Sequence, residues 1–99
     1  MLSIKEPYEF VWDKGNKNKN LKKHNISDNE CEEVFFDDNK KILRDKLHSS
    51  KEKRYILLGK TKNKKLLFLV FTIRLKKIRI ISTRQISKNK EKKLYEKTN

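Results

Sequence analysis

Apolar residues gather in short blocks along this chain, and the spacing within each block indicates the element that it forms. Residues 65–74 form the longest and most apolar block, which predicts the longest strand of a sheet. In residues 8–12, Tyr8, Phe10 and Trp12 fall on one face, which is the period of a half-buried strand. Further strands bounded by polar turns are predicted at 40–44, 54–59 and 78–81. Together the blocks predict a sheet of about four strands.

The segment from Ser27 carries the clearest helix signal. Ser27 and Glu30 stand in the S-x-x-E arrangement of a capping box, in which each side chain accepts the backbone N–H of the other residue. Cys31, Val34 and Phe35 follow at helical spacing and predict the buried face of that helix. We therefore interpret Cys31 as a small core residue and not as a nucleophile.

Two further helices are predicted, and both are poor in apolar residues. The first spans about 13–24, with its aspartate as the cap and Leu21 among its few apolar anchors. Asn25 is expected to end it, because asparagine tolerates a left-handed conformation. The second spans about 87–97 with Tyr95 among its few apolar residues, so it is expected to dock weakly or to need a partner.

A tight hairpin is predicted around Lys76 and Lys77. With these lysines at its tip, Arg74 lies opposite Arg79 on one face of the sheet, and the other face is a continuous apolar surface that helices must cover. The predicted fold is therefore α+β, an antiparallel sheet of about four strands packed by N-terminal and C-terminal helices. At 99 residues the chain is expected to be one domain over 1–99.

Composition adds a large excess of positive charge. Lys and Arg number 27 against 13 Asp and Glu, which gives a formal net charge of +14. Self-repulsion of this size destabilises a compact fold and indicates a polyanionic partner, either nucleic acid or an acidic protein. A codon bias toward lysine is the alternative explanation for any single lysine run.

The same composition argues against several kinds of site. Cys31 is the only cysteine, so no intramolecular disulfide can form, and two histidines do not make a zinc-ligand pattern. No metal or other cofactor is expected. The first residues lack the apolar core of a signal peptide, and no apolar run approaches the roughly 20 residues of a membrane span. These features predict a soluble, cytoplasmic protein.

Arginine is used selectively, at five positions, and Arg74, Arg79 and Arg84 fall within residues 72–84. Since lysine would serve for a solvated charge, the arginines indicate a need for a planar, bidentate fork. Two adjacent guanidinium groups repel each other, so a phosphate is the expected occupant between Arg74 and Arg79. The alternative is that each arginine pairs with its own helix carboxylate. Strict alternation turns Arg84 to the other sheet face unless a bulge intervenes.

The connector before the strand at 54–59 contains groups suited to RNA cleavage. His48, Glu52 and Arg54 supply an imidazole, a carboxylate and a guanidinium within seven positions. Cleavage by the 2′-hydroxyl of RNA needs a base, an acid and cations around the phosphorane, and histidine can serve as base or acid near neutral pH. His48 could equally be a locally packed loop residue. In that case Tyr95, Glu52 or Lys23 is next in line for proton transfer.

Several motifs occur in a specific order: F-V-W-D at 10–13, N-L-K-K-H at 20–24, the helix from Ser27, H-S-S-K-E-K-R at 48–54, R-I-I-S-T-R at 79–84 and Tyr95-Glu96. This series resembles the BrnT family of type II toxin–antitoxin systems, whose members are similar in fold to the RelE toxins. The resemblance implies a homodimeric ribonuclease that inhibits translation. It also implies a BrnA antitoxin, a ribbon-helix-helix protein, through which alone the toxin would reach operator DNA. Asn25 and Asn63 stand where the family usually has glycine, and asparagine suits both turns.

The residue arguments and the resemblance together define a predicted site. The predicted catalytic residues are His48, Glu52, Arg54, Arg74, Arg79 and Tyr95. The predicted RNA-binding residues are Lys23, His24, Arg84, Lys76 and Lys77. Two other classes of function would use the same cationic surface: a nucleic-acid-binding module without chemistry, and a structural protein that receives an acidic chain.

Overall fold

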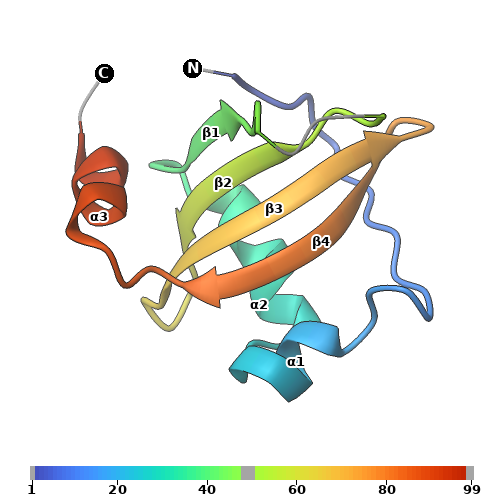
Figure 1. Ribbon diagram of the computed structural model, residues 1–99, viewed down its shortest axis with the longest axis horizontal. Coiled ribbons are helices and arrows are strands. Elements are labelled where there is room, and N and C mark those ends of the chain that lie inside the picture. The colour runs from blue at the N-terminus through green and yellow to red at the C-terminus, as the bar shows by residue number, and fades with distance from the viewer. Residues whose placement is uncertain (1, 48–50, 98–99) are drawn as a thin grey trace.

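The computed structural model describes residues 2–47 and 51–97, and these residues form a four-stranded sheet (Figure 1). The strands are β1 (Lys41–Arg44), β2 (Tyr55–Lys60), β3 (Leu66–Arg74) and β4 (Lys77–Gln85). They lie side by side in chain order, and each neighbouring pair is antiparallel. The predicted strands at 40–44, 54–59 and 65–74 are confirmed, with bounds that differ by a residue at some ends.

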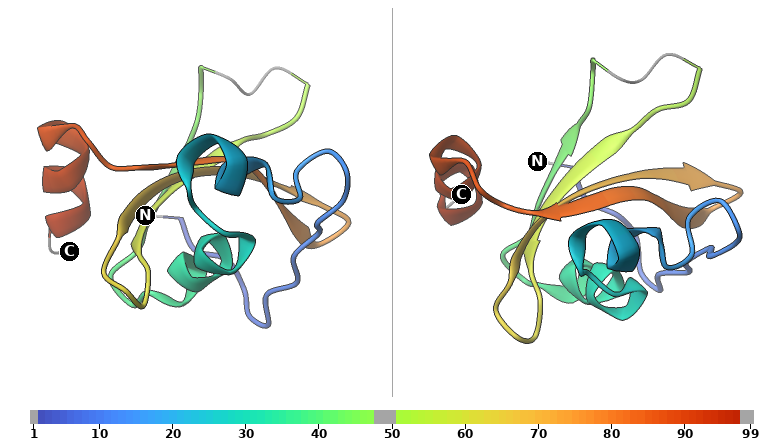
Figure 2. Two further views of the ribbon diagram at one scale, coloured as in Figure 1. Left: turned by 90° about the horizontal axis from the view of Figure 1, so that it is seen from below. Right: turned by 60° about the horizontal axis from the view of Figure 1, so that its bottom comes forward.

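The first helices cover one face of the sheet, which we call the inner face; we call the opposite face the outer face. The helices are α1 (Lys19–His24), α2 (Asp28–Glu33), the 3₁₀ turn η1 (Val34–Phe36) and α3 (Asn89–Glu96). Figures 1 and 2 show α1 and α2 on the inner-face side of the sheet and α3 at one end of the sheet. The α+β fold predicted from the sequence is confirmed. None of the described helices is long and apolar enough to cross a membrane.

The core lies between the inner face and the α2–η1 segment. Its fully buried members are apolar residues from both layers: Ile26, Cys31, Val34, Phe35, Leu57, Leu67, Leu69 and Phe71. The predicted capping box is present, because Glu30 N–H donates to Ser27 Oγ at 3.1 Å and Ser27 N–H donates to Glu30 Oε1 at 3.0 Å. Burial raises the pKa of the Cys31 thiol to about 11, so the thiol stays protonated at neutral pH. The interpretation of Cys31 as a core residue is therefore confirmed.

The predicted strand at 8–12 is present only as a single bridge. Phe10 forms a parallel bridge with Ile78, in which Val11 N–H donates to Ile78 O at 2.8 Å and Ile78 N–H donates to Glu9 O at 2.7 Å. Tyr8 and Phe10 nevertheless face the core as predicted, since both rings pack edge-on to Phe35. A regular strand does not continue, because a turn follows at Asp13, whose backbone oxygen accepts the N–H groups of Asn16 and Lys17.

The helix predicted at 13–24 is much shorter, and its expected anchor was wrong. Asp13 accepts the N–H of Gly15 at 2.8 Å and so starts a turn, and α1 begins only after Asn18, which has a left-handed φ of 58°. Leu21 is 44% exposed, whereas Asn20 is 5% exposed. The polar Asn20 therefore anchors α1. Asn25 ends the helix at φ 57°, as predicted.

The β3–β4 hairpin is shifted by two residues from the predicted register. Leu75 and Lys76 have φ values of 50° and 66°, which is the pattern of a two-residue type I′ turn. Arg74 therefore pairs with Lys77, and Thr72 pairs with Arg79. The expected pairing of Arg74 with Arg79 was wrong, because the turn is centred one residue earlier. A shift of two keeps each side chain on its face, so both arginines still lie on the outer face.

A β-bulge decides the position of Arg84. Phe71 pairs with Ile80 and Val70 pairs with Ser82, so Ile81 is an extra residue on β4. Beyond the bulge Arg84 pairs with Phe68, an outer-face residue. The three arginines of residues 72–84 therefore lie on one face of the sheet.

Asn20 offers a test of how α1 is held. Asn20 Oδ1 accepts the buried N–H of Thr83 at 3.0 Å, next to the bulge. Asn20→Ala is expected to lower the free energy of unfolding by about 1–3 kcal/mol, because that N–H loses its partner. The exposed neighbour Leu21 provides the control, because Leu21→Ala should change the free energy of unfolding by less than about 0.5 kcal/mol. Urea unfolding measures both, and equal losses would contradict this account of α1.

Candidate active site

Two arginines of the outer face are each held by a carboxylate from another segment. Arg74 binds Glu52 through two parallel hydrogen bonds, from Nε to Oε2 and from Nη2 to Oε1, the second at 3.0 Å. Arg79 binds Asp13 in the same manner, from Nη1 to Oδ2 at 2.7 Å and from Nη2 to Oδ1 at 3.0 Å. We call Asp13, Glu52, Arg74 and Arg79 the arginine cluster. In each pair, two parallel hydrogen bonds fix the plane of the guanidinium group.

The sequence analysis favoured a phosphate between the two arginines over separate carboxylates. The structure shows the separate carboxylates, and they come from a turn and from the connector, not from helices. These two carboxylates neutralise the positive charges of the arginines, so the expected repulsion between adjacent guanidinium groups is removed within the chain. An incoming phosphate has to displace a carboxylate or bind beside it.

The charges of the cluster act on one another. The hydrogen bond from Arg79 holds the pKa of Asp13 below its usual value, and Arg74 also contributes. The hydrogen bond from Arg74 holds the pKa of Glu52 below its usual value, with contributions from Arg54 and Arg79. Both carboxylates are therefore ionised at neutral pH, and their ion pairs are lost only as pH falls through these lowered values. A carboxylate with a lowered pKa is a weak general base.

A cavity of about 360 Å³ opens beside the cluster. Its lining consists of Val11, Asp13, Arg74, Leu75, Lys77 and Arg79. The Arg79 side chain is 16% exposed and the Arg74 side chain is 55% exposed, so Arg74 forms the accessible rim and Arg79 the floor. Lys77 Nζ is 3.8 Å from Glu9 and adds a mobile positive charge at the mouth. The cavity can accept one anionic group with cations on two sides.

The other predicted residues are distributed around the molecule. Lys76 lies with Lys77 at the hairpin turn beside the cluster, whereas Lys23 and His24 are exposed at the end of α1 (Figure 1). The positive charge of Arg54 contributes to the lowered pKa of Glu52, so Arg54 lies near the cluster. His48 lies outside the residues that the structure describes.

Arg84 joins the sheet to α3. Its guanidinium donates two hydrogen bonds to Glu91, from Nη1 at 3.0 Å and from Nη2 at 2.6 Å, and lies 4.2 Å from the centre of the Phe68 ring. These contacts hold the pKa of Glu91 below its usual value. Arg84 is thus fully engaged in docking α3, away from the cavity.

Tyr95 is also part of the α3 contact. Its hydroxyl donates to Asp37 Oδ2 at 2.6 Å, and the same carboxylate oxygen accepts the N–H of Lys60 at 2.8 Å. Burial and the neighbouring Asp37 raise the pKa of the Tyr95 phenol. Figure 1 shows α3 at the end of the sheet opposite the β3–β4 turn, so Tyr95 is not brought together with Arg74 and Arg79.

Comparison with known families gives one match. The model of the family described as "Ribonuclease toxin, BrnT, of type II toxin-antitoxin system" matches residues 12–90, which is most of the chain and includes all four residues of the arginine cluster. This chain belongs to the BrnT family. The resemblance inferred from its motifs is confirmed, and membership makes it a ribonuclease toxin of a type II toxin–antitoxin system. No curated protein matches the chain.

Sequence reasoning missed the turn that supports Arg79 in this BrnT chain. Asn16 is buried, accepts the N–H of Asp13 at 2.8 Å, and donates to the backbone oxygens of Val11 at 2.8 Å and Ile80 at 3.2 Å. Asn16 thereby fastens the 13–16 turn to β4 and holds Asp13 opposite Arg79. The D-x-G-N sequence of 13–16 is a turn signature that could have indicated this support.

Gly15 leaves the space that Arg79 occupies. A Cβ at Gly15 would lie 2.5 Å from Arg79 Nη2, the end of a flexible side chain. Gly15→Ala should therefore displace the guanidinium and, if Arg79 takes part in RNA cleavage, lower the cleavage rate about a hundredfold, which a small misplacement of a catalytic group can cost. The melting temperature should change little, because Gly15 has no positive φ and the displaced group is a chain end. The measurement is the RNA cleavage rate and the melting temperature of Gly15→Ala, with Lys14→Ala as the control. A normal cleavage rate in Gly15→Ala would show that Arg79 takes no part in cleavage.

Proposed function

We propose that this BrnT toxin cleaves RNA at the arginine cluster, by attack of a 2′-hydroxyl on the neighbouring phosphate, and that it thereby inhibits translation. One observation carries the proposal: two guanidinium groups with fixed planes meet at one cavity on an otherwise lysine-rich chain. Fixed donors that face a phosphate stabilise charge without reorganising during the reaction. Lysines alone would supply charge but not this geometry.

In the proposed reaction the 2′-oxygen forms a bond to phosphorus, and the bond from phosphorus to the 5′-oxygen breaks. The 2′-hydroxyl loses its proton to a base, the 5′-oxygen gains a proton from an acid, and the products are a 2′,3′-cyclic phosphate and a 5′-hydroxyl. Arg74 and Arg79 stabilise the additional negative charge on the phosphorane oxygens. No metal ion is required in this scheme, since the guanidinium groups supply the positive charge.

Asp13 and Glu52 are proposed to orient the arginines and not to transfer protons. Their lowered pKa values make them weak bases, and each engages only two N–H groups of its arginine, so a phosphate can bind beside them to the remaining N–H groups. The sequence-based candidate for proton transfer remains His48, whose ordinary pKa is near 6.5. Tyr95 is a poor candidate, because its proton is held by Asp37 far from the cavity.

Replacing Arg74 or Arg79 by lysine tests the proposed chemistry. The substitution keeps the charge and removes the second parallel hydrogen bond, and loss of one transition-state donor commonly costs about a hundredfold in rate. Melting temperatures should change little, because the surface ion pairs contribute little to stability. Cleavage of a defined RNA by both variants, beside their melting curves, is the measurement.

A matched control separates catalysis from bulk charge. Lys76→Arg and Lys77→Arg keep the charge at the same cavity and should cleave at the normal rate. Full activity in Arg74→Lys and Arg79→Lys would show that charge suffices and would favour a binding protein without chemistry. In the same assay, a normal pH profile of His48→Ala would assign proton transfer to another group.

The proposed partner is a BrnA-type antitoxin, a ribbon-helix-helix protein through which the toxin, acting as a homodimer, would repress its own operon. Support for an acidic partner comes from the net charge of +14, which steers association with anionic surfaces. The matching family consists of toxins of type II toxin–antitoxin systems, which implies an antitoxin as partner.

Expression in bacteria tests the toxic function. Wild-type protein produced without a partner is expected to arrest growth and to lower incorporation of labelled amino acids, because RNA needed for translation is cut. Arg79→Lys is the matched control and should permit growth at an equal protein level. Co-expression of the neighbouring reading frame should restore growth and yield a co-purifying complex. Normal growth with abundant wild-type protein would count against a toxin.

A further inference from the structure

The helix α3 has a defined orientation on the sheet. Glu91 binds Arg84 of β4, and Tyr95, one helical turn later, donates to Asp37. Lys60 Nζ lies over the Tyr95 ring, 5.9 Å from its centre. Residues four apart lie on one side of a helix, so Glu91 and Tyr95 define the inward side of α3. Three charge-assisted hydrogen bonds, two from Arg84 to Glu91 and one from Tyr95 to Asp37, thus hold a helix that is poor in apolar residues.

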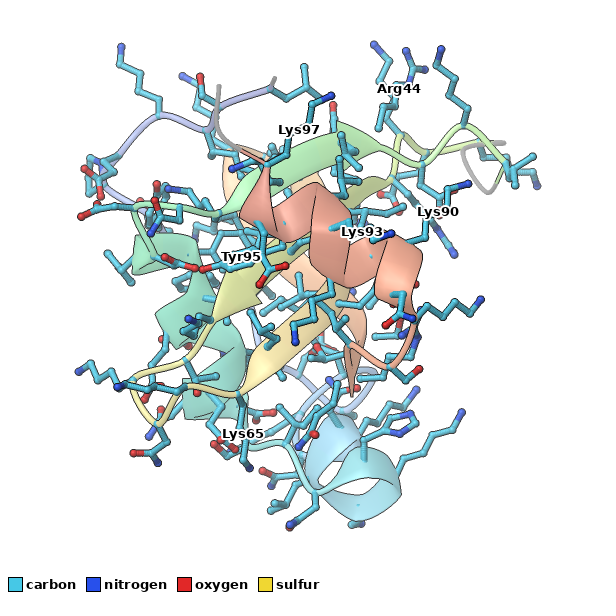
Figure 3. All side chains as sticks on the ribbon, turned by 90° about the vertical axis from the view of Figure 1, so that its left-hand side faces the viewer. Arg44, Lys65, Lys90, Lys93, Tyr95 and Lys97 are labelled. Carbon is cyan, nitrogen blue, oxygen red and sulfur yellow. The ribbon has the colours of Figure 1, made fainter. Side chains whose placement is uncertain are left out.

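The outward side of α3 is a row of lysines. Lys90 and Lys93 are exposed three residues apart on α3, and the exposed Lys97, which caps the C-terminus of the helix with an extended backbone, follows four residues later. We call these three lysines the lysine stripe. Figure 3 looks onto the exposed side of α3, along which the three residues lie. The stripe runs about 10 Å along the helix axis, from the rise of 1.5 Å per residue.

The stripe keeps an excess of positive charge, with three lysines and one exposed carboxylate, Glu96, on this side of α3. Within the part of the chain that the structure describes, no ion pair involves any of its three lysines. Of the two acidic residues of α3, Glu91 is bound to Arg84, and Glu96 is exposed beside Lys97 without an ion pair among the described residues. Like charges at helical spacing destabilise a helix, so the arrangement is unfavourable until an anion covers it.

The chemistry of the stripe favours a phosphodiester backbone over an acidic protein. Centres of protein interfaces are depleted in lysine and enriched in apolar and aromatic residues, and the stripe contains neither, since Tyr95 is turned inward. Lysines act as point charges that contact phosphates without reading bases. A row of lysines is therefore suited to holding a strand of RNA.

We infer that the lysine stripe is a second RNA-binding surface, which holds the backbone of the substrate at a distance from the arginine cluster. The inference rests on the proposed ribonuclease function and specifies its substrate. In Figure 1, α3, which carries the stripe, lies at the end of the sheet opposite the β3–β4 turn, whose Arg74, Leu75 and Lys77 line the cavity, and the longest extent of the molecule is 34 Å. A strand that reaches both must cross the sheet, so the preferred substrate is an RNA long enough to do so.

The test is the triple variant Lys90→Gln, Lys93→Gln and Lys97→Gln, because glutamine keeps helix propensity and removes charge. Loss of three phosphate contacts should reduce the slope of log affinity against log salt by about 2 and weaken binding of a long RNA about tenfold or more at low salt. The KM for that RNA should rise with kcat unchanged. Cleavage of a short oligonucleotide that spans only the cavity should keep its KM.

The control variant Lys5→Gln, Lys62→Gln and Lys64→Gln removes the same charge from exposed positions elsewhere. Equal losses in both triple variants would show that only net charge matters and would overturn the inference. So would a normal KM and salt slope in the stripe variant. Weaker binding of poly-glutamate with unchanged RNA binding would also overturn it, by assigning the stripe to an acidic protein.

Failure of the proposed function gives a different result. If the wild-type protein cuts no RNA, the cleavage proposal fails, and the salt dependence of RNA binding still decides the role of the stripe. If cleavage is normal and the stripe variant behaves as wild type, only the stripe loses its role. Circular dichroism of both triple variants establishes that α3 is retained.

Discussion

Bidentate pairing between arginines of one sheet face and carboxylates of other segments organises this toxin. Arg79 binds the turn through Asp13, Arg74 binds the connector through Glu52, and Arg84 binds α3 through Glu91. Each pair therefore fastens a peripheral segment to the sheet. Exposed ion pairs add little to stability, but the planar fork of arginine defines direction, and direction is what a catalytic site requires.

This arrangement depends on the bulge in β4. Without the extra residue Ile81, strict alternation would direct Arg84 to the inner face, where a guanidinium would enter the apolar core. The bulge also brings Thr83 to the inner face, where Asn20 satisfies its N–H and Cys31 contacts its hydroxyl at 3.2 Å. One inserted residue thus allows β4 to contribute to the core and to the outer face along its whole length.

The shortage of acidic residues has a consequence for function. With 13 acidic side chains for 27 basic ones, carboxylates used to hold arginines are not available to lysines. Described ion pairs of Asp13, Glu52 and Glu91 all involve arginine, while the lysine stripe on α3 takes part in none. The molecule therefore combines a pair of fixed guanidinium groups, Arg74 and Arg79, beside the β3–β4 turn with solvated ammonium groups on the exposed side of α3. The first kind suits chemistry at one phosphate, and the second suits holding a long polyanion.

The sequence by itself determined the four strands of the sheet, the capping box, the buried face of α2 and the family, because these follow from local periodicity and from motif order. Tertiary structure decided what depends on the position of one residue relative to a distant one. The turn at Leu75 and Lys76 set the register, the bulge set the face of Arg84, and the turn at 13–16 supplied the partner of Arg79. Charge composition predicted that an anion binds the arginines, but only the folded chain shows that carboxylates of the same chain bind them. The sequence could not indicate this pairing, because Asp13 and Arg79 are 66 positions apart.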